Sequence, residues 1–154
     1  MTFSVPVVVR GYELDTQGHL NQAVYVQYAE HARWELLRAA GLPQQKLIGA
    51  GVGPVVLETT IKYLRELGGG DEVLVTCEFG WRSGKTFAVE QRIHHLDDTV
   101  AAEIHSVGGL LDLTTRKLVA TPDRRIAELA QQPELLGLPS AARTDAQPPI
   151  PGNT

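Results

Sequence analysis

The sequence predicts an α+β fold in which one long helix packs against a five-stranded antiparallel sheet. Three observations predict it: one long segment with helical periodicity, five segments with alternating apolar residues, and short turns rich in Gly and Asp. The chain has 154 residues, enough for one domain. One helix covers only one face of such a sheet, so the other face is expected to meet solvent or a second subunit.

The first strand is predicted over residues 3–13, where Val5, Val7 and Val9 alternate with other residues. The long helix is predicted over residues 21–40. Its apolar residues recur at three- and four-residue spacing and define one face: Tyr25, Tyr28, Ala29, Ala32, Leu36, Ala39 and Ala40. Gly41, with Pro43 two residues later, is typical of a helix C-terminus.

Four further strands are predicted over residues 57–63, 73–81, 87–94 and 100–113. Short turns separate them, at residues 68–71, 82–85 and 97–98. Because short turns join antiparallel neighbours, these four strands are predicted to form a meander in which each pairs with the next.

The folded domain is predicted to end near residue 131. Five of the nine prolines fall in the last 22 residues, and all nine aromatic residues lie at or before Phe87. Few bulky side chains are left to offset the entropy of ordering this end of the chain. The prediction is therefore a domain over residues 1–131 and a proline-rich, disordered tail over residues 132–154.

Composition excludes several classes of protein. The net charge of −4 gives no surplus of Lys and Arg for binding nucleic acid. No apolar run approaches the ~18–20 residues that span a bilayer, and no signal peptide precedes the domain, so a cytoplasmic protein without stable membrane insertion is expected. Cys77 is the single cysteine and has no Cys or His at metal-ligand spacing, so it is predicted to be a small buried hydrophobic residue rather than part of a metal site.

The segment between the first strand and the long helix carries the candidate chemistry. Asp15, Gly18, His19 and Asn21 lie in a turn that leads into the helix N-terminus. Unpaired N–H groups in the first helical turn can polarise a carbonyl or hold an oxyanion, and a nearby carboxylate can act as nucleophile or as base for water. Taken singly, each residue has a structural explanation: a turn-forming Asp, a Gly with positive φ, a hydrogen-bonded His and an N-cap Asn.

The motif Asp15-x-x-Gly18-His19-x-Asn21-x-x-x-Tyr25, followed by Glu30, Arg33 and Gly41, resembles the signature of hotdog-fold thioesterases of the 4-hydroxybenzoyl-CoA thioesterase family. The resemblance covers roughly residues 3–126. It implies a sheet wrapped around the long helix, a homodimer or homotetramer, and active sites at the subunit interface. It also assigns two sets of site residues. The catalytic set consists of Asp15, Gly18, His19 and Gln22. The substrate-binding set consists of Asn21, Tyr25, Glu30 and Thr86.

Within that assignment, Asp15 is the nucleophile or general base, and the backbone N–H of Gln22 polarises the thioester carbonyl. No metal or redox cofactor is expected, because a thioester is already an activated acyl group. The predicted reaction is hydrolysis of an acyl-CoA or acyl-carrier-protein thioester. Basic residues that could contact the phosphates of coenzyme A are Lys62, Arg65, Arg82, Lys85 and Arg92.

Two other functions remain open. A hotdog dehydratase or hydratase would need a His base with a carboxylate, for which His19 and Glu30 are available; Glu30 has an alternative structural reading as the partner of Arg33. A non-catalytic acyl-thioester-binding domain would not require Asp15. The acyl pocket itself cannot be placed from sequence, and its candidate residues are Tyr28, Trp34, Val55 and Trp81.

Overall fold

The structure is a computed structural model that describes residues 2–140. Two 3-10 helices, Gly11–Glu13 and Pro133–Leu136, accompany three α-helices and five strands. In chain order these are β1 (Phe3–Val8), α1 (Gln22–Ala39), α2 (Gln44–Gly49), β2 (Val52–Tyr63), β3 (Glu72–Trp81), β4 (Thr86–His95), β5 (Val100–Asp112) and α3 (Pro122–Leu129).

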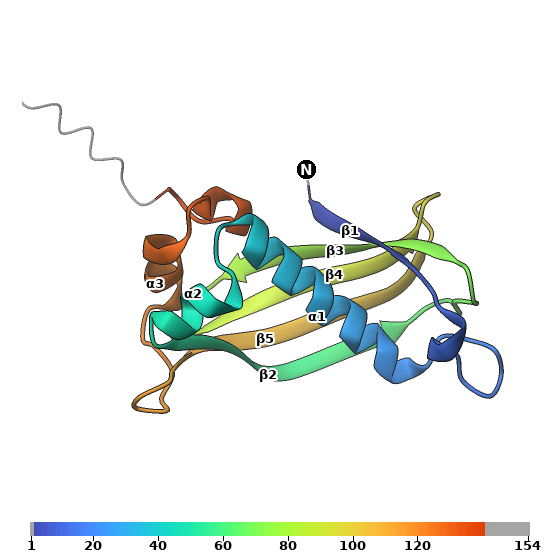
Figure 1. Cartoon of the computed structure of the whole chain (residues 1–154), viewed down its shortest axis with the longest axis horizontal. Coiled ribbons are helices and arrows are strands. Elements are labelled where there is room, and N and C mark those ends of the chain that lie inside the picture. Colours follow the sequence, from blue (N-terminus) through green and yellow to red (C-terminus); the bar gives the residue numbers. More distant parts are fainter. Residues whose placement is uncertain (1, 141–154) are drawn as a thin grey trace, which may run out of the picture.

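The five strands form one antiparallel sheet that curves around α1 (Figure 1). The predicted α+β architecture, with a five-stranded sheet wrapped around one long helix, is confirmed. The helices α2 and α3, which the sequence analysis did not predict, lie together at one end of the sheet, and the N-terminus of α1 lies at the other end (Figure 1). The first strand is shorter than predicted, because the chain turns into a 3-10 helix at Gly11.

The predicted meander is wrong in one pairing. The strand order is β1-β3-β4-β5-β2, so β2 pairs with β5 at one edge and β1 lies beside β3 at the other. The connection from β2 to β3 covers residues 64–71, longer than the about two to five residues of a hairpin loop. At about 3.3 Å per residue it spans roughly 26 Å, enough to cross three strand spacings of about 4.8 Å each.

The helix α1 begins and ends where the sequence predicts. The side chain of Asn21 caps it, with Oδ1 accepting a hydrogen bond from Ala23 N at 2.9 Å, and Gly41 follows its end with a φ of 84°. The face turned to the sheet carries the buried residues Tyr25, Tyr28, Ala29, Ala32, Leu36 and Leu37. This packing fixes the helix N-terminus relative to the sheet.

The packed domain continues past the predicted boundary at residue 131. Leu136 is 1% exposed, Leu138 is also buried, and Trp81 Nε1 donates a hydrogen bond to Leu136 O at 2.6 Å. Residues 133–138 are therefore part of the domain, because two of their leucines are buried and their backbone accepts a hydrogen bond from a side chain of β3. The last 14 residues of the predicted tail, 141–154, lie outside the described residues.

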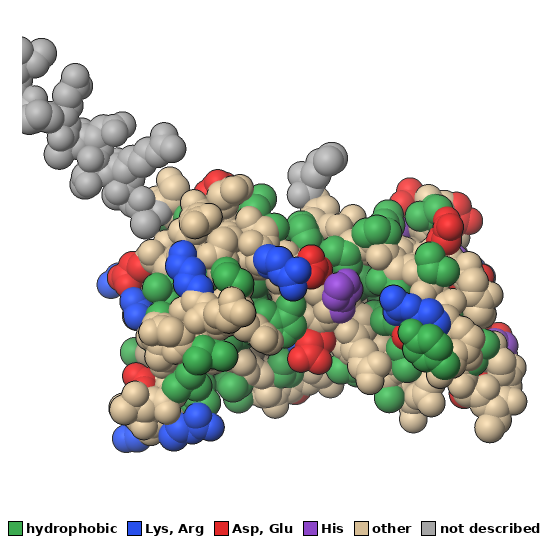
Figure 2. All heavy atoms as spheres, viewed as in Figure 1, with side chains coloured by type: hydrophobic (Ala, Val, Ile, Leu, Met, Phe, Trp, Pro, Cys, Tyr) green, Lys and Arg blue, Asp and Glu red, His purple; other side chains and the backbone are tan. Residues whose placement is uncertain are grey.

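Other features bear on function. Cys77 is buried as predicted, and burial raises the pKa of its thiol to about 12. On the face drawn in Figure 2, basic side chains are interspersed with acidic and hydrophobic ones, with no large basic patch. Among the described helices, none is long and apolar enough to cross a membrane.

Candidate active site

The segment from Glu13 to Asn21 is folded by its own hydrogen bonds. Glu13 is tied to α1, because its Oε1 accepts a hydrogen bond from the Tyr28 hydroxyl at 2.6 Å. The Asp15 N–H donates to His19 O at 2.7 Å, and the Gly18 N–H donates to Asp15 O at 3.1 Å. Gly18 has a φ of 79°, a conformation that glycine adopts without strain. This loop places Asp15 and His19 side by side ahead of the helix.

The Asp15 carboxylate is held by two backbone amides. Its Oδ1 accepts hydrogen bonds from Gln17 N at 2.9 Å and His19 N at 3.1 Å. These two amides, His19 foremost, hold the pKa of Asp15 below its ordinary value, so the carboxylate is ionised at neutral pH. Within residues 2–140 no side chain or amide donates to Oδ2, which leaves that oxygen for a substrate or water.

The first turn of α1 supplies a second polar group. Asn21 Oδ1 accepts from Ala23 N, whereas the Gln22 N–H, at the first helical position, has no hydrogen-bond acceptor among the described residues. An unengaged amide at a helix N-terminus carries partial positive charge and suits a carbonyl oxygen. The carbonyl oxygen of Gln22 accepts a hydrogen bond from the Tyr63 hydroxyl at 3.0 Å, which fixes this turn against β2.

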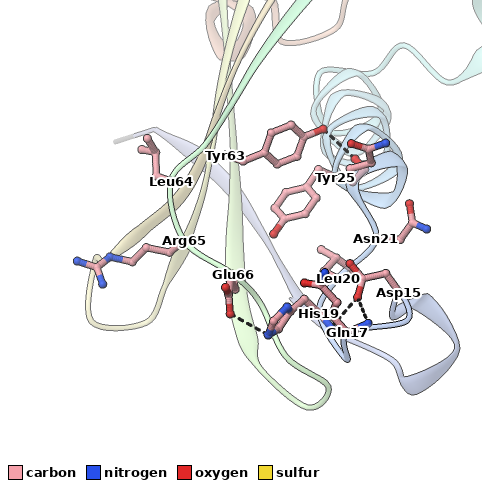
Figure 3. Close-up of a pocket in the computed structure, with 11 residues that line it drawn as sticks. Asp15, Gln17, His19, Leu20, Asn21, Tyr25, Tyr63, Leu64, Arg65 and Glu66 are labelled. Carbon is pink, nitrogen blue, oxygen red and sulfur yellow. Dashed lines mark hydrogen bonds and ion pairs between the residues drawn. The ribbon is translucent and has the colours of Figure 1, made fainter.

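These groups share one open pocket of about 450 Å³ (Figure 3). Four segments line it: the loop before α1, the first turn of α1, the end of β2 and the residues after β2. Its lining residues are Asp15, Gln17, His19, Leu20, Asn21, Gln22, Tyr25, Tyr63, Leu64, Arg65 and Glu66. The structure thus brings together five of the eight predicted site residues as side chains or backbone around one cavity: Asp15, His19, Asn21, Gln22 and Tyr25. Gly18 shapes the loop from outside the lining.

Tyr25 forms the inner wall of this pocket. Its side chain is 3% exposed and its ring meets that of Tyr63 edge to face, with centroids 5.0 Å apart. Burial raises the pKa of Tyr25, and Tyr63 adds to that effect. The phenol therefore stays protonated at neutral pH and is able to donate a hydrogen bond.

The connection between β2 and β3 contributes residues that the sequence analysis missed. Glu66 Oε2 lies 2.8 Å from His19 Nε2, and Leu20 N donates to Leu67 O at 2.7 Å. Their separation along the chain, 47 residues for the first pair, gave no signal. They reach the pocket because this connection crosses the sheet from β2 at one edge to β3 beside the strand at the other edge.

Two predicted substrate-binding residues lie elsewhere. Glu30 lines two smaller cavities farther along α1, of about 190 and 210 Å³, and no ion pair joins it to Arg33 among the described residues. Thr86 begins β4 at the end of the sheet near α2 and α3, opposite the Asp15 loop (Figure 1). Neither residue lines the Asp15 pocket of its own chain.

Of the basic residues considered for phosphate contacts, Arg65 alone lines the Asp15 pocket. Figure 3 shows its side chain extending away from Asp15, on the other side of the cavity. Among the acyl-pocket candidates, Trp34 and Val55 line the cavity of about 190 Å³. The other two are engaged in hydrogen bonds: Tyr28 donates to Glu13, and Trp81 donates to Leu136 O. Within residues 2–140 no three His, Cys, Asp or Glu side chains gather in a way that could hold a metal ion.

Comparison with known proteins identifies the family and the fold. A family model described as the Thioesterase-like superfamily matches residues 9–132. The chain is 30% identical over 129 residues to the acyl-CoA thioester hydrolase YbgC of Escherichia coli O157:H7, covering 84% of this chain and 96% of that one. It is 38% identical over 79 residues to the chloroplastic acyl-acyl carrier protein thioesterase ATL3 of Arabidopsis thaliana, covering 51% of this chain and 42% of the plant protein.

This chain therefore spans less than half the length of the plant relative that it matches. Among solved structures, the probable thioesterase YbaW of Escherichia coli superimposes with a TM-score of 0.73 at 27% identity, covering 82% of this chain and 94% of that one.

Proposed function

The chain belongs to the thioesterase-like superfamily, and on that premise we propose that it is an enzyme that hydrolyses acyl-CoA thioesters to the free acid and the thiol. One observation carries the proposal for the site: the ionised Asp15 carboxylate and the unengaged Gln22 N–H line the same open pocket. A thioester hydrolase needs these two functions, a base or nucleophile and a donor for the developing oxyanion.

In the proposed reaction the thioester carbonyl oxygen accepts a hydrogen bond from Gln22 N–H. Asp15 Oδ2 either takes a proton from a water that attacks the carbonyl carbon, or attacks that carbon itself to form an anhydride that water then hydrolyses. In both routes the C–S bond breaks and the thiolate leaves with a proton from solvent. Label in the Asp15 carboxylate after a single turnover in ¹⁸O-water would identify the anhydride route, because label reaches Asp15 only when water hydrolyses an anhydride at the carboxyl carbon of Asp15.

We propose that no metal or redox cofactor takes part, because the thioester bond is activated already. Treatment with a chelator is then expected to leave turnover unchanged. Loss of activity on chelation, restored by a divalent cation, would contradict this part of the proposal.

The acyl group of the substrate is carried either by coenzyme A or by an acyl carrier protein. The names of the relatives include both an acyl-CoA hydrolase and an acyl-carrier-protein thioesterase. A thiol-release screen over acyl-CoA and acyl-carrier-protein panels, with Asp15→Ala as the inactive control, tests the function and ranks the two carriers. Saturable binding of all these thioesters without thiol release would instead favour a binding domain.

The dehydratase or hydratase alternative has less support. It would pair His19 with Glu30, and these residues line different cavities within the chain. Hydration of an enoyl thioester without thiol release is the result that would restore it.

We further propose that the protein acts in the cytoplasm as a homodimer or homotetramer. Within residues 2–140 no strand lies beside the edge of β2 that faces away from β5. Val56 and Leu57 of β2 are exposed, as are Tyr63 and Leu64 at its end. A long open edge with exposed apolar residues is suited to pairing with a second copy. Light scattering after size-exclusion chromatography is expected to give the mass of two or four chains, and a monomer at assay concentration would contradict this proposal.

A further inference from the structure

The connection after β2 supports the whole Asp15 loop. Residues 64–71, named here the crossover segment, form a β-bridge from Gly68 to His19 and accept the Leu20 N–H at Leu67 O, 2.7 Å away. The crossover segment is itself closed by a hydrogen bond from Gly68 N to Asp71 Oδ2 at 2.8 Å. The backbone that carries His19 is therefore docked on a second, distant segment of the chain.

Glu66 adds a polar side-chain contact between these two segments. Its Oε2 lies 2.8 Å from His19 Nε2, and both side chains line the Asp15 pocket (Figure 3). The backbone of the same His19 holds Asp15, since its N–H donates to Asp15 Oδ1 at 3.1 Å and its carbonyl accepts from Asp15 N at 2.7 Å. His19 therefore contacts Glu66 through its ring and Asp15 through its backbone, and so links the two carboxylates.

The Glu66–His19 pair is too exposed to contribute much to folding stability, which favours a role in orienting the site. The Glu66 side chain is 73% exposed, and an exposed ion pair contributes little to folding stability. The ring of His19 has no other side-chain partner among the described residues. Without Glu66 the imidazole is free to rotate at the rim of the pocket, and the loop that orients Asp15 loses its side-chain anchor.

We propose that Glu66 is a positioning residue for thioester hydrolysis: by fixing the His19 imidazole it holds the loop that aims the Asp15 carboxylate into the pocket. This inference rests on the proposed function, because it assigns to Glu66 a part in the reaction of Asp15. Small displacements of a reacting group lower the fraction of productive encounters, so the effect falls on kcat rather than on substrate affinity.

The test compares Glu66→Ala, Glu66→Gln, His19→Ala and the double variant His19→Ala/Glu66→Ala in full-length protein, with kcat and KM measured by thiol release. Glu66→Ala is expected to lower kcat about tenfold with KM changed less than about twofold. Glu66→Gln keeps an oxygen that accepts from Nε2 and is expected to restore kcat to within about threefold of the original protein. In the His19→Ala background, Glu66→Ala is expected to add less than about twofold.

A matched control is available on the outer face of the sheet. Glu90 contacts His105 Nδ1, an exposed pair of the same two residue types that does not line the Asp15 pocket. Glu90→Ala is expected to leave both kcat and KM unchanged. Thermal unfolding of every variant separates loss of positioning from loss of fold.

Three results would overturn the proposal: an unchanged kcat in Glu66→Ala, an equal loss in Glu66→Ala and Glu66→Gln, or a further large loss from Glu66→Ala in the His19→Ala background. Failure of the proposed function is distinguished by a different measurement, the turnover of Asp15→Asn. If Asp15→Asn keeps full turnover the assignment of Asp15 is wrong, whatever the Glu66 variants do.

Discussion

Asn21 is expected to have two separable roles, one in folding and one in substrate binding. Its Oδ1 caps α1 through the hydrogen bond from Ala23 N, and the residue lines the Asp15 pocket. Asn21→Ala removes both groups, whereas Asn21→Ser replaces the cap and removes only the amide. The pair of variants therefore distinguishes the two roles.

The size of each effect follows from the contacts. Loss of an N-cap costs about 1 kcal/mol, which for a domain of this length lowers Tm by roughly 2–4 °C. Asn21→Ala is expected to show that fall, and Asn21→Ser to unfold within about 1 °C of the original protein. If the amide contacts the substrate, both variants raise KM about fivefold, the effect of one hydrogen bond of about 1 kcal/mol.

Thermal unfolding followed by circular dichroism and thiol-release kinetics measure the two effects on the same samples. An unchanged Tm in Asn21→Ala would refute the capping argument. A KM for Asn21→Ser equal to that of the original protein would refute the assignment of Asn21 to substrate binding, and would leave it as an N-cap alone.

Three further predictions concern the carrier, the domain boundary and pH. Arg65→Gln is expected to raise KM for acyl-CoA about threefold but to leave KM for acyl-pantetheine unchanged, because acyl-pantetheine lacks the nucleotide phosphates. The control Arg92→Gln, at a residue outside the Asp15 pocket, is expected to change neither KM. Steady-state kinetics with both substrates measure these values. Leu136→Ala is expected to lower the free energy of unfolding by about 2–5 kcal/mol in chemical denaturation, because it empties a buried site. In a pH–rate profile, the acid limb of kcat/KM is expected to lie below the ordinary aspartate pKa of about 3.9, because hydrogen bonds from the His19 and Gln17 amides lower the pKa of Asp15 and activity is lost only as pH falls through it.

The outcomes that would contradict these predictions are specific. An equal rise in KM for both thioesters would show that Arg65 contacts something other than the nucleotide. A loss below about 1 kcal/mol in Leu136→Ala would return the domain boundary to residue 131. An acid limb well above the ordinary aspartate pKa of about 3.9 would show that the base is a group other than Asp15.

Local patterns in the sequence predicted most of the elements, because each pattern reports the environment of the residues that carry it. The apolar spacing from Tyr25 to Leu36 predicts a helix with one buried face, and Asn21 and Gly41 mark its ends. The prediction failed where adjacency in sequence was taken for adjacency in the sheet. The residues 64–71 contain the glycines of a turn, but their length allows the chain to cross the sheet.

That one topological difference also limited the predicted site. The loop from Asp15 to Gln22 is a local unit, so its residues could be grouped from a short motif and from the family which that motif resembles. Tyr63, Arg65 and Glu66 reach the same pocket only because β2 pairs with β5 and the crossover segment returns past His19. Contacts of that kind depend on the register of whole strands and leave no mark in a short motif.

The central claim is that the Asp15 carboxylate performs the chemistry of thioester hydrolysis. Asp15→Asn keeps an oxygen that accepts from the Gln17 and His19 amides and removes only the charge, so the loop and the Tm are expected to stay unchanged. The direct measurement is the rate of thiol release by Asp15→Asn on the best acyl-CoA substrate. The account predicts a fall in kcat of at least about 10²-fold, and a rate within about threefold of the original protein would contradict it.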